Sequence, residues 1–233
     1  MLFSSYVFLR IGLLALKYQK LLGNDFEENF FVTKGLCQKV LEIAEIELEC
    51  FGADNVPHKD SLMIFSNHKS FIDPLVIIAT INRPTTFVSK SEAFSYLFAK
   101  RYLEALNCIS IDRFRNQRID KEKIMATQRE ITRYLEKNNS LLIFPEGGTV
   151  KTEEIEKFKA ASFRAPKEVN SYILPTYIEG TDKVFKKGFI LSSEMKKVRI
   201  VYGEPFKPSE LDVKNTKDIA IYTQEQVLRL KNR

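Results

Sequence analysis

Hydrophobic and polar residues follow two different rhythms along the chain. Short apolar runs at residues 62–66 (LMIFS) and 140–144 (SLLIF) end in polar or turn-forming residues. Runs of this kind are typical of strands buried on both faces of a parallel sheet. Residues 121–137 instead repeat apolar positions at helical spacing, which predicts a long amphipathic helix.

The same reading predicts the other elements of the main domain. Strands are expected at 46–52, 85–90, 108–112, 171–179 and 197–206, helices at 74–81, 93–106 and 158–168, and part of a hairpin at 185–193. Because strands alternate with helices, we expect an α/β fold, with a mostly parallel central sheet flanked by helices. No repeat or linker divides the chain, so residues 45–233 read as one α/β domain behind a helical extension at 1–44.

The N-terminal segment is apolar but carries internal charge. Residues 2–22 (LFSSYVFLRIGLLALKYQKLL) are interrupted by Arg10, Lys17 and Lys20, so the run of ~18 apolar residues expected of a spanning helix is absent. A basic helix with leucines and aromatics on its other face is the pattern of a segment lying in the membrane interface. A helix that packs on the protein core is the alternative. Residues 1–44 are expected to form two helices.

Composition excludes some classes of partner. The 36 Lys plus Arg residues outnumber the 30 Asp plus Glu residues, giving a formal net charge of +6 spread over a mixed surface. This excess favours anionic partners only modestly, and no strand has the aromatic pattern of nucleic-acid binding, so no nucleic-acid partner is expected. The 3 cysteines are widely spaced without CxxC, which disfavours disulfides and a zinc site and indicates a reducing, cytosolic setting.

Polar residues placed directly after the apolar runs are the candidate site. In open parallel sheets, sites lie beyond the carboxyl ends of the strands, so these residues are expected to meet at one rim. They are Asn67, His68, Asp73, Lys90, Asp112, Arg113, Glu146, Gly147 and Gly148.

His68 and Asp73 form the most informative pair. Five residues along an ideal helix would leave them on different faces, so a loop between strand and helix must bring them together. Such a pair makes a general base whose tautomer and positive charge are controlled by the carboxylate. Alternatively, Asp73 is only an N-cap, with Pro74 at the first helical position.

No protein nucleophile accompanies this base. The chain has no GxSxG motif, and with 2 histidines in all it has no HExxH zinc-binding pattern. The attacking group is therefore expected to be a substrate hydroxyl, which means acyl transfer to an alcohol, or an activated water.

The turn at IFPEGGTVK supplies the complementary chemistry. A strand that breaks at Gly147 and Gly148 exposes backbone N–H groups that can hold a phosphate or a developing oxyanion, although a tight turn without a ligand is the alternative. Lys90 and Arg113 follow strand ends and can bind phosphate, or can simply be solvated cations.

These motifs together resemble those of the glycerophospholipid acyltransferase family, and within it the bacterial 1-acyl-glycerol-3-phosphate acyltransferases. NHKSFIDP resembles the first motif, NHxxxxD, CISIDR the second, FPEGG the third and ILPTYIEG the fourth, in the same order and spacing. The resemblance covers residues from about 45 to 205.

The resemblance implies a reaction. His68 would deprotonate the glycerol hydroxyl with Asp73 as its partner, and the oxygen would attack the thioester of acyl-CoA or an acyl carrier protein. Lysophosphatidate would become phosphatidate on a membrane lipid surface, at its cytoplasmic face, without a metal or organic cofactor. The expected substrate-binding residues are Asn67, Lys90, Arg113, Glu146, Gly147, Gly148 and Lys151.

The third motif departs from the family pattern. The family usually continues EGTRS, whereas this chain reads EGGTVK, so Gly148 replaces the threonine and the phosphate-binding arginine is missing. Lys151 is near enough in sequence to replace the charge, but not the bidentate fork. The FKxG pattern downstream becomes FKAAS, with Lys159. The alternatives are therefore another lysolipid or glycolipid acceptor, a non-catalytic membrane-binding relative, or an esterase.

Overall fold

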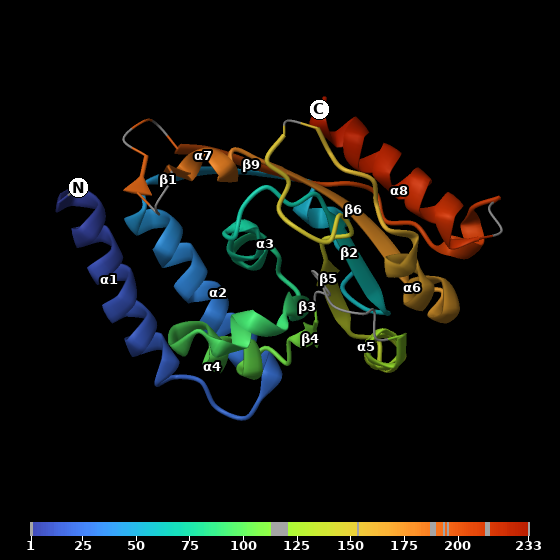
Figure 1. Ribbon diagram of the computed structural model, residues 1–233, viewed down its shortest axis with the longest axis horizontal. Helices are drawn as coiled ribbons and strands as arrows, with labels where there is room; N and C mark the ends of the chain where they lie inside the picture. The colour runs from blue at the N-terminus through green and yellow to red at the C-terminus, as the bar shows by residue number, and fades with distance from the viewer. Residues whose placement is uncertain are drawn as a thin grey trace.

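The chain folds around one central sheet. The computed structural model describes residues 2–112, 121–152, 154–186, 190–192, 194, 196–212 and 215–232. Within this part of the chain, seven strands pair in the order β1-β9-β6-β2-β5-β3-β4 (Figure 1). They are β1 Ile46–Phe51, β2 Leu62–Ser66, β3 Thr85–Lys90, β4 Ile109–Ile111, β5 Ser140–Ile143, β6 Tyr172–Glu179 and β9 Lys196–Tyr202.

The sheet is parallel except at one pairing. β6 and β9 run antiparallel, and every other neighbouring pair is parallel. A parallel crossover needs a connection of about a dozen residues or more, usually a helix. Antiparallel strands need no such crossover. The β6–β9 connection contains the short helix α7 Thr181–Val184 and the antiparallel pair β7 Phe185–Lys186 and β8 Ile190–Leu191. The predicted mostly parallel α/β fold is confirmed.

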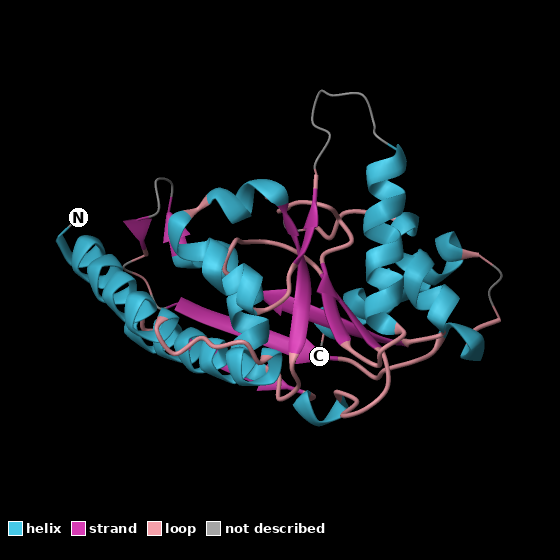
Figure 2. Ribbon diagram, turned by 90° about the horizontal axis from the view of Figure 1, so that it is seen from below, coloured by secondary structure: helices cyan, strands magenta, loops and turns pink. Residues whose placement is uncertain are grey.

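Helices cover both faces of the sheet (Figures 1 and 2). On one side lie α1 Leu2–Gln19, α2 Phe26–Ile43, α3 Asp73–Thr80 and α4 Leu97–Ala105. On the other lie α5 Lys121–Leu135, α6 Arg164–Val169 and α8 Thr216–Lys231. Four short 3-10 helices complete the described part of the chain: η1 Ala53–Asn55, η2 Ser91–Ser95, η3 Ala160–Phe163 and η4 Pro208–Glu210.

The central strand β2 explains why its apolar run is continuous. Leu62 and Ile64 join the hydrophobic cluster that includes α2 and α3, whereas Met63 and Phe65 join the cluster on the side of α5 and α8. Successive side chains of a strand point to opposite faces, so a strand covered on both faces needs an apolar residue at each position. All of β2 is buried.

Two predicted helices are shorter than expected. The segment 93–106 is divided because Tyr96 has an extended backbone, with φ −77° and ψ 120°, between η2 and α4. The segment 158–168 is divided into η3 and α6, because Phe163, with φ −99° and ψ 5°, leaves the α-helical region.

Helix α8 was not among the predicted elements. Its N-cap is Asn215, whose Oδ1 accepts hydrogen bonds from the backbone N–H groups of Lys217 and Asp218 at 2.9 and 3.1 Å. The buried side chains Ile219, Ala220, Thr223, Val227 and Leu230 recur at helical spacing. The cap and this spacing are readable in the sequence and would have predicted the helix.

The two predicted N-terminal helices are present, and they differ in environment. α2 buries Phe30, Cys37 and Leu41 in the main core. α1 buries Val7 but leaves an apolar outer face exposed. Within the described residues, no helix is long and apolar enough to cross a bilayer. The boundary between an extension at 1–44 and a domain at 45–233 remains a prediction.

Candidate active site

The loop between β2 and α3 brings His68 and Asp73 together. The His68 Nδ1 atom lies 2.7 Å from Asp73 Oδ2. The same carboxylate oxygen accepts the backbone N–H groups of Lys69 at 2.7 Å and Ser70 at 2.9 Å. The fully buried Asp73 carboxylate accepts a hydrogen bond from the protonated Nδ1 atom. The lone pair of the neutral imidazole is therefore on Nε2, where it can act as a base.

Asp73 does not cap α3 as an N-cap residue would. It is the first residue of α3, and Ile72 occupies the N-cap position without a side-chain cap. The carboxylate instead turns back over the loop that precedes it, where it binds the imidazole. This corrects the expectation of an Asp73 N-cap, and the reason is the contact with His68.

The ring and the backbone of His68 each make one further contact. The ring stacks on Phe144, with ring centroids 4.0 Å apart and an interplanar angle of 16°. The backbone carbonyl of His68 accepts a hydrogen bond from the Val150 N–H at 2.8 Å. The His68 side chain is 13% exposed, and Nε2 makes no hydrogen bond with any described residue. One edge of the imidazole is therefore open to a substrate.

The turn after β5 lies against this pair. The Gly147 N–H donates to the Phe144 carbonyl at 3.0 Å, and Gly147 has a φ of +77°, which favours glycine. The N–H of Gly148 makes no hydrogen bond with another described residue. It is thus available to a phosphate or an oxyanion.

Glu146 is the unusual group of this turn. The side chain is buried, and neither carboxylate oxygen has a hydrogen-bond partner among the described residues. Burial raises the pKa of the Glu146 carboxyl from 4.5 to about 8, although the nearby His68 backbone N–H and the Lys69 ammonium lower it. Glu146 is therefore largely uncharged at neutral pH, so it does not repel an anionic ligand beside it.

The other predicted site residues differ in their surroundings. Asn67 is buried, and its side-chain amide makes two hydrogen bonds of 2.8 Å with the backbone of Ile178, which tie the end of β2 to β6. Lys90 ends β3 at the same rim and is exposed, as is Lys151. Arg113 lies outside the described residues. Substrate binding by these four residues remains a prediction.

Lys69 was not predicted as a site residue. Its ammonium donates to the backbone carbonyls of Thr152 at 2.5 Å and Glu154 at 2.8 Å. These two hydrogen bonds join the segment after the diglycine turn to the loop that carries His68. A lysine between two motif residues gives no sequence signal for such a contact.

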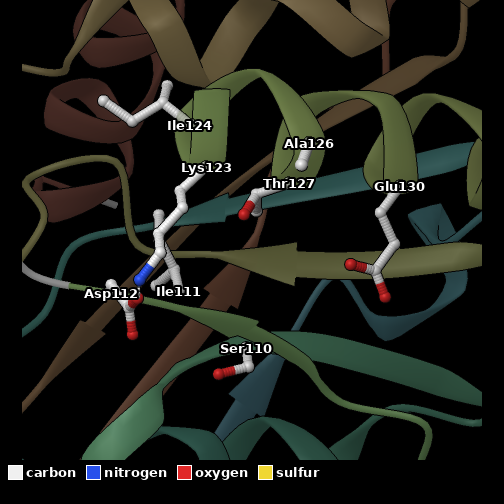
Figure 3. Close-up of a pocket in the computed structure, with 8 residues that line it drawn as sticks. All are labelled: Ser110, Ile111, Asp112, Lys123, Ile124, Ala126, Thr127 and Glu130. Carbon is white, nitrogen blue, oxygen red and sulfur yellow. Dashed lines mark hydrogen bonds and ion pairs between the residues drawn. The ribbon is translucent and has the colours of Figure 1, made fainter. Parts of the chain in front are cut away.

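A cavity of about 230 Å³ lies elsewhere, between the edge strand β4 and α5 (Figure 3). Lys123 of α5 points toward Asp112 after β4, and their charged atoms are 3.1 Å apart. Ser110, Thr127 and Glu130 also line it. Neither His68 nor Asp73 borders this cavity, so it is separate from the candidate active site.

The family follows from the residues that surround His68. Residues 47–179 match the acyltransferase family model, a span that holds His68, Asp73 and the diglycine turn. The chain belongs to the acyltransferase family. It is an enzyme that transfers acyl groups to oxygen.

Several curated relatives match most of this chain. The chain is 24% identical over 192 residues to a probable 1-acyl-sn-glycerol-3-phosphate acyltransferase of Mycoplasma pneumoniae, which covers 77% of the chain and 69% of the relative. It is 27% identical over 166 residues to a 1-acyl-sn-glycerol-3-phosphate acyltransferase of Borreliella burgdorferi, with 70% of the chain and 64% of that relative covered. The chain thus spans about two thirds of the length of these relatives.

A solved structure has the same fold. The crystal structure of the 1-acyl-sn-glycerophosphate (LPA) acyltransferase PlsC from Thermotoga maritima aligns with a TM-score of 0.78 at 19% identity. The alignment covers 99% of this chain and 94% of the other. It includes the N-terminal helices as well as the sheet.

Proposed function

We propose that this acyltransferase moves a fatty acyl group from an acyl thioester to the free hydroxyl of 1-acyl-glycerol 3-phosphate, forming phosphatidic acid. The observation that carries the proposal is the His68–Asp73 contact of 2.7 Å, with Nε2 open and no protein nucleophile in the motif. A base of this kind needs a substrate hydroxyl on which to act. The names of the curated relatives support this acceptor.

The proposed reaction proceeds by direct transfer. His68 Nε2 takes the proton of the acceptor hydroxyl as its oxygen bonds to the thioester carbonyl carbon. The buried Asp73 carboxylate stabilises the resulting imidazolium. When the carbon–sulfur bond of the tetrahedral intermediate breaks, the imidazolium returns the proton to the departing thiolate. The donor is acyl-CoA or an acyl carrier protein, and both provide the same thioester.

We further propose that α1 lies in the interface of the cytoplasmic face of the membrane. Its outer side chains Tyr6, Leu9 and Leu13 are 58%, 62% and 60% exposed, and the Arg10 guanidinium lies over the Tyr6 ring, 5.6 Å from its centroid. α1 is also fixed to the protein, because the Tyr102 hydroxyl donates to the Ala15 carbonyl at 2.5 Å.

Aromatic contacts connect this helix to the catalytic loop. Phe8 of α1 stacks on Phe185 at 5.8 Å between centroids, and Phe185 lies 5.2 Å from the Phe71 ring. Phe71 is 51% exposed and only a few residues from His68. A lysolipid in the same membrane leaflet would thus have its glycerol near the base.

The reaction is tested with a labelled acyl thioester and lysophosphatidate in mixed micelles, with the lipid products separated. We expect labelled phosphatidate. Free fatty acid as the main product would indicate an esterase. Faster turnover of a phosphate-free or headgroup-bearing lysolipid would overturn the assignment of lysophosphatidate as the acceptor. The missing arginine of the third motif is the reason to include these lysolipids in the test.

Membrane attachment is tested by Leu9→Glu combined with Leu13→Glu. Burying a leucine contributes about 1.5–3 kcal/mol, so we expect partitioning into vesicles with anionic lipid to fall about 100-fold or more. The matched control is Ile221→Glu with Leu228→Glu on α8, where the side chains are 43% and 40% exposed. Equal partitioning of both double variants would argue against attachment through α1.

A further inference from the structure

Two lysines could replace the phosphate-binding arginine that the third motif lacks, Lys151 and Lys159. Lys151 is the cation nearest in sequence; it and Lys159 are both exposed, and neither side chain makes a hydrogen bond or ion pair with a described residue. Lys159 is farther along the chain, yet its ammonium lies on the diglycine turn. A Cβ added at Gly147 would fall 2.0 Å from Lys159 Nζ and 3.0 Å from Cε.

The backbone of Lys159 is held in this position. Its N–H donates to the Pro145 carbonyl at 3.0 Å, and its own carbonyl accepts the Ser162 N–H at 3.0 Å. The preceding residue, Phe158, is 2% exposed, and its N–H donates to Gln224 Oε1 at 3.1 Å. The side chain therefore starts from a fixed point and reaches back over the turn.

The Lys159 charge has no counterion in the described part of the chain. Its ammonium makes no hydrogen bond or ion pair with a described residue. The N–H of Gly148, the residue after Gly147, is likewise unused by described residues. A cation and a backbone donor on one turn, neither with an acceptor among the described residues, can bind an oxyanion.

The turn is close enough to the base for the phosphate of the acceptor. In 1-acyl-glycerol 3-phosphate, the phosphorus atom is three bonds from the carbon that carries the free hydroxyl. A group that binds this phosphate must therefore lie near His68 Nε2. The turn meets this condition, because Phe144 stacks on the His68 ring and Val150 donates to the His68 carbonyl.

We infer that Lys159, with the Gly148 N–H, holds the phosphate of the acceptor in place of the missing arginine, and that Lys151 does not. Gly147 contributes by lacking a Cβ, since any side chain there would displace the ammonium. This inference rests on the proposed function, because it assigns a residue to the phosphate of that acceptor.

The decisive variant is Lys159→Met, compared with Lys151→Met as the rival position and Lys157→Met as an exposed control on the same segment. For Lys159→Met we expect KM for lysophosphatidate to rise roughly 10-fold or more, the effect of losing one hydrogen bond to a charged group. KM for the thioester should be unchanged, and Lys159→Arg should restore most of the loss. Inhibition by glycerol 3-phosphate should weaken by the same factor.

Direct binding separates failure of this inference from failure of the proposed function. Glycerol 3-phosphate binding is measured by calorimetry without any thioester. Weakened binding in Lys159→Met supports the site even if the wild type makes no phosphatidate. Phosphatidate formation with an unchanged KM in Lys159→Met, or a larger effect of Lys151→Met, would overturn the assignment of Lys159 while the proposed function stands.

Discussion

Replacing His68 by alanine is expected to lower kcat by roughly 10²- to 10⁴-fold, the range that a positioned general base contributes. The loss follows from the site geometry: Nε2 is the open nitrogen, and Asp73 occupies Nδ1 at 2.7 Å. Initial rates are measured at saturating thioester and lysophosphatidate, so that the change appears in kcat. Binding of the acceptor should change far less, because the imidazole touches the reacting hydroxyl and not the phosphate.

The chain offers a matched control for this variant. His58, the other histidine, is exposed in the loop before β2, and His58→Ala should leave kcat unchanged. The circular dichroism spectrum of His68→Ala should equal that of the wild type, because the Asp73 carboxylate keeps its hydrogen bonds from the Lys69 and Ser70 N–H groups. Near-normal turnover by a correctly folded His68→Ala protein would contradict the role of His68 as the base.

The Glu146→Gln variant is expected to become increasingly more stable than the wild type as pH rises. The folded-state pKa of this carboxyl is raised from 4.5 to about 8 by burial. In the interval between these values the folded state binds the proton more tightly than the unfolded state, so wild-type stability falls with increasing pH. Glutamine has no proton to lose and avoids this loss. Between pH 5 and pH 9 the difference in free energy of unfolding should grow by about 4 kcal/mol in favour of the variant, at about 1.4 kcal/mol per pKa unit.

Denaturant unfolding of both proteins at several pH values measures this difference. Glu154→Gln is the control, because Glu154 is exposed on the same segment. Its difference from the wild type should not vary with pH over the same range. A constant difference for Glu146→Gln as well would mean that the carboxyl titrates normally, and would remove the argument that it is uncharged beside a bound phosphate.

Much of the site was predictable because it depends on short segments. His68 and Asp73 stand at the two ends of one short loop, so their spacing alone required a turn that joins imidazole and carboxylate. The neighbouring parallel strands β2, β5 and β3 explain why the residues after each of them share a rim. The roles proposed for Lys90 and Lys151 rest on sequence position, because neither side chain makes a hydrogen bond or ion pair with a described residue.

Other features depend on contacts between distant segments. Asn67 follows β2 like the other rim residues, yet its amide is used by Ile178, which is 111 positions away. Helix α8 was missed, although its cap and spacing were legible. The contacts of Lys69 and the position of the Lys159 ammonium depend on how the segment after β5 folds back, which no local pattern specifies.

Periodicity and motif spacing were sufficient for the α/β class, the two N-terminal helices and the contact between His68 and Asp73, because each depends on interactions within one helix, strand or loop. Only the tertiary structure revealed three other features. They are the antiparallel pairing of β9, the burial that raises the pKa of Glu146, and the position of the Lys159 ammonium. These properties come from burial and from the way the segment after β5 folds back over the turn, and the same local sequence in another packing would have given a solvated acid and a lysine away from the turn.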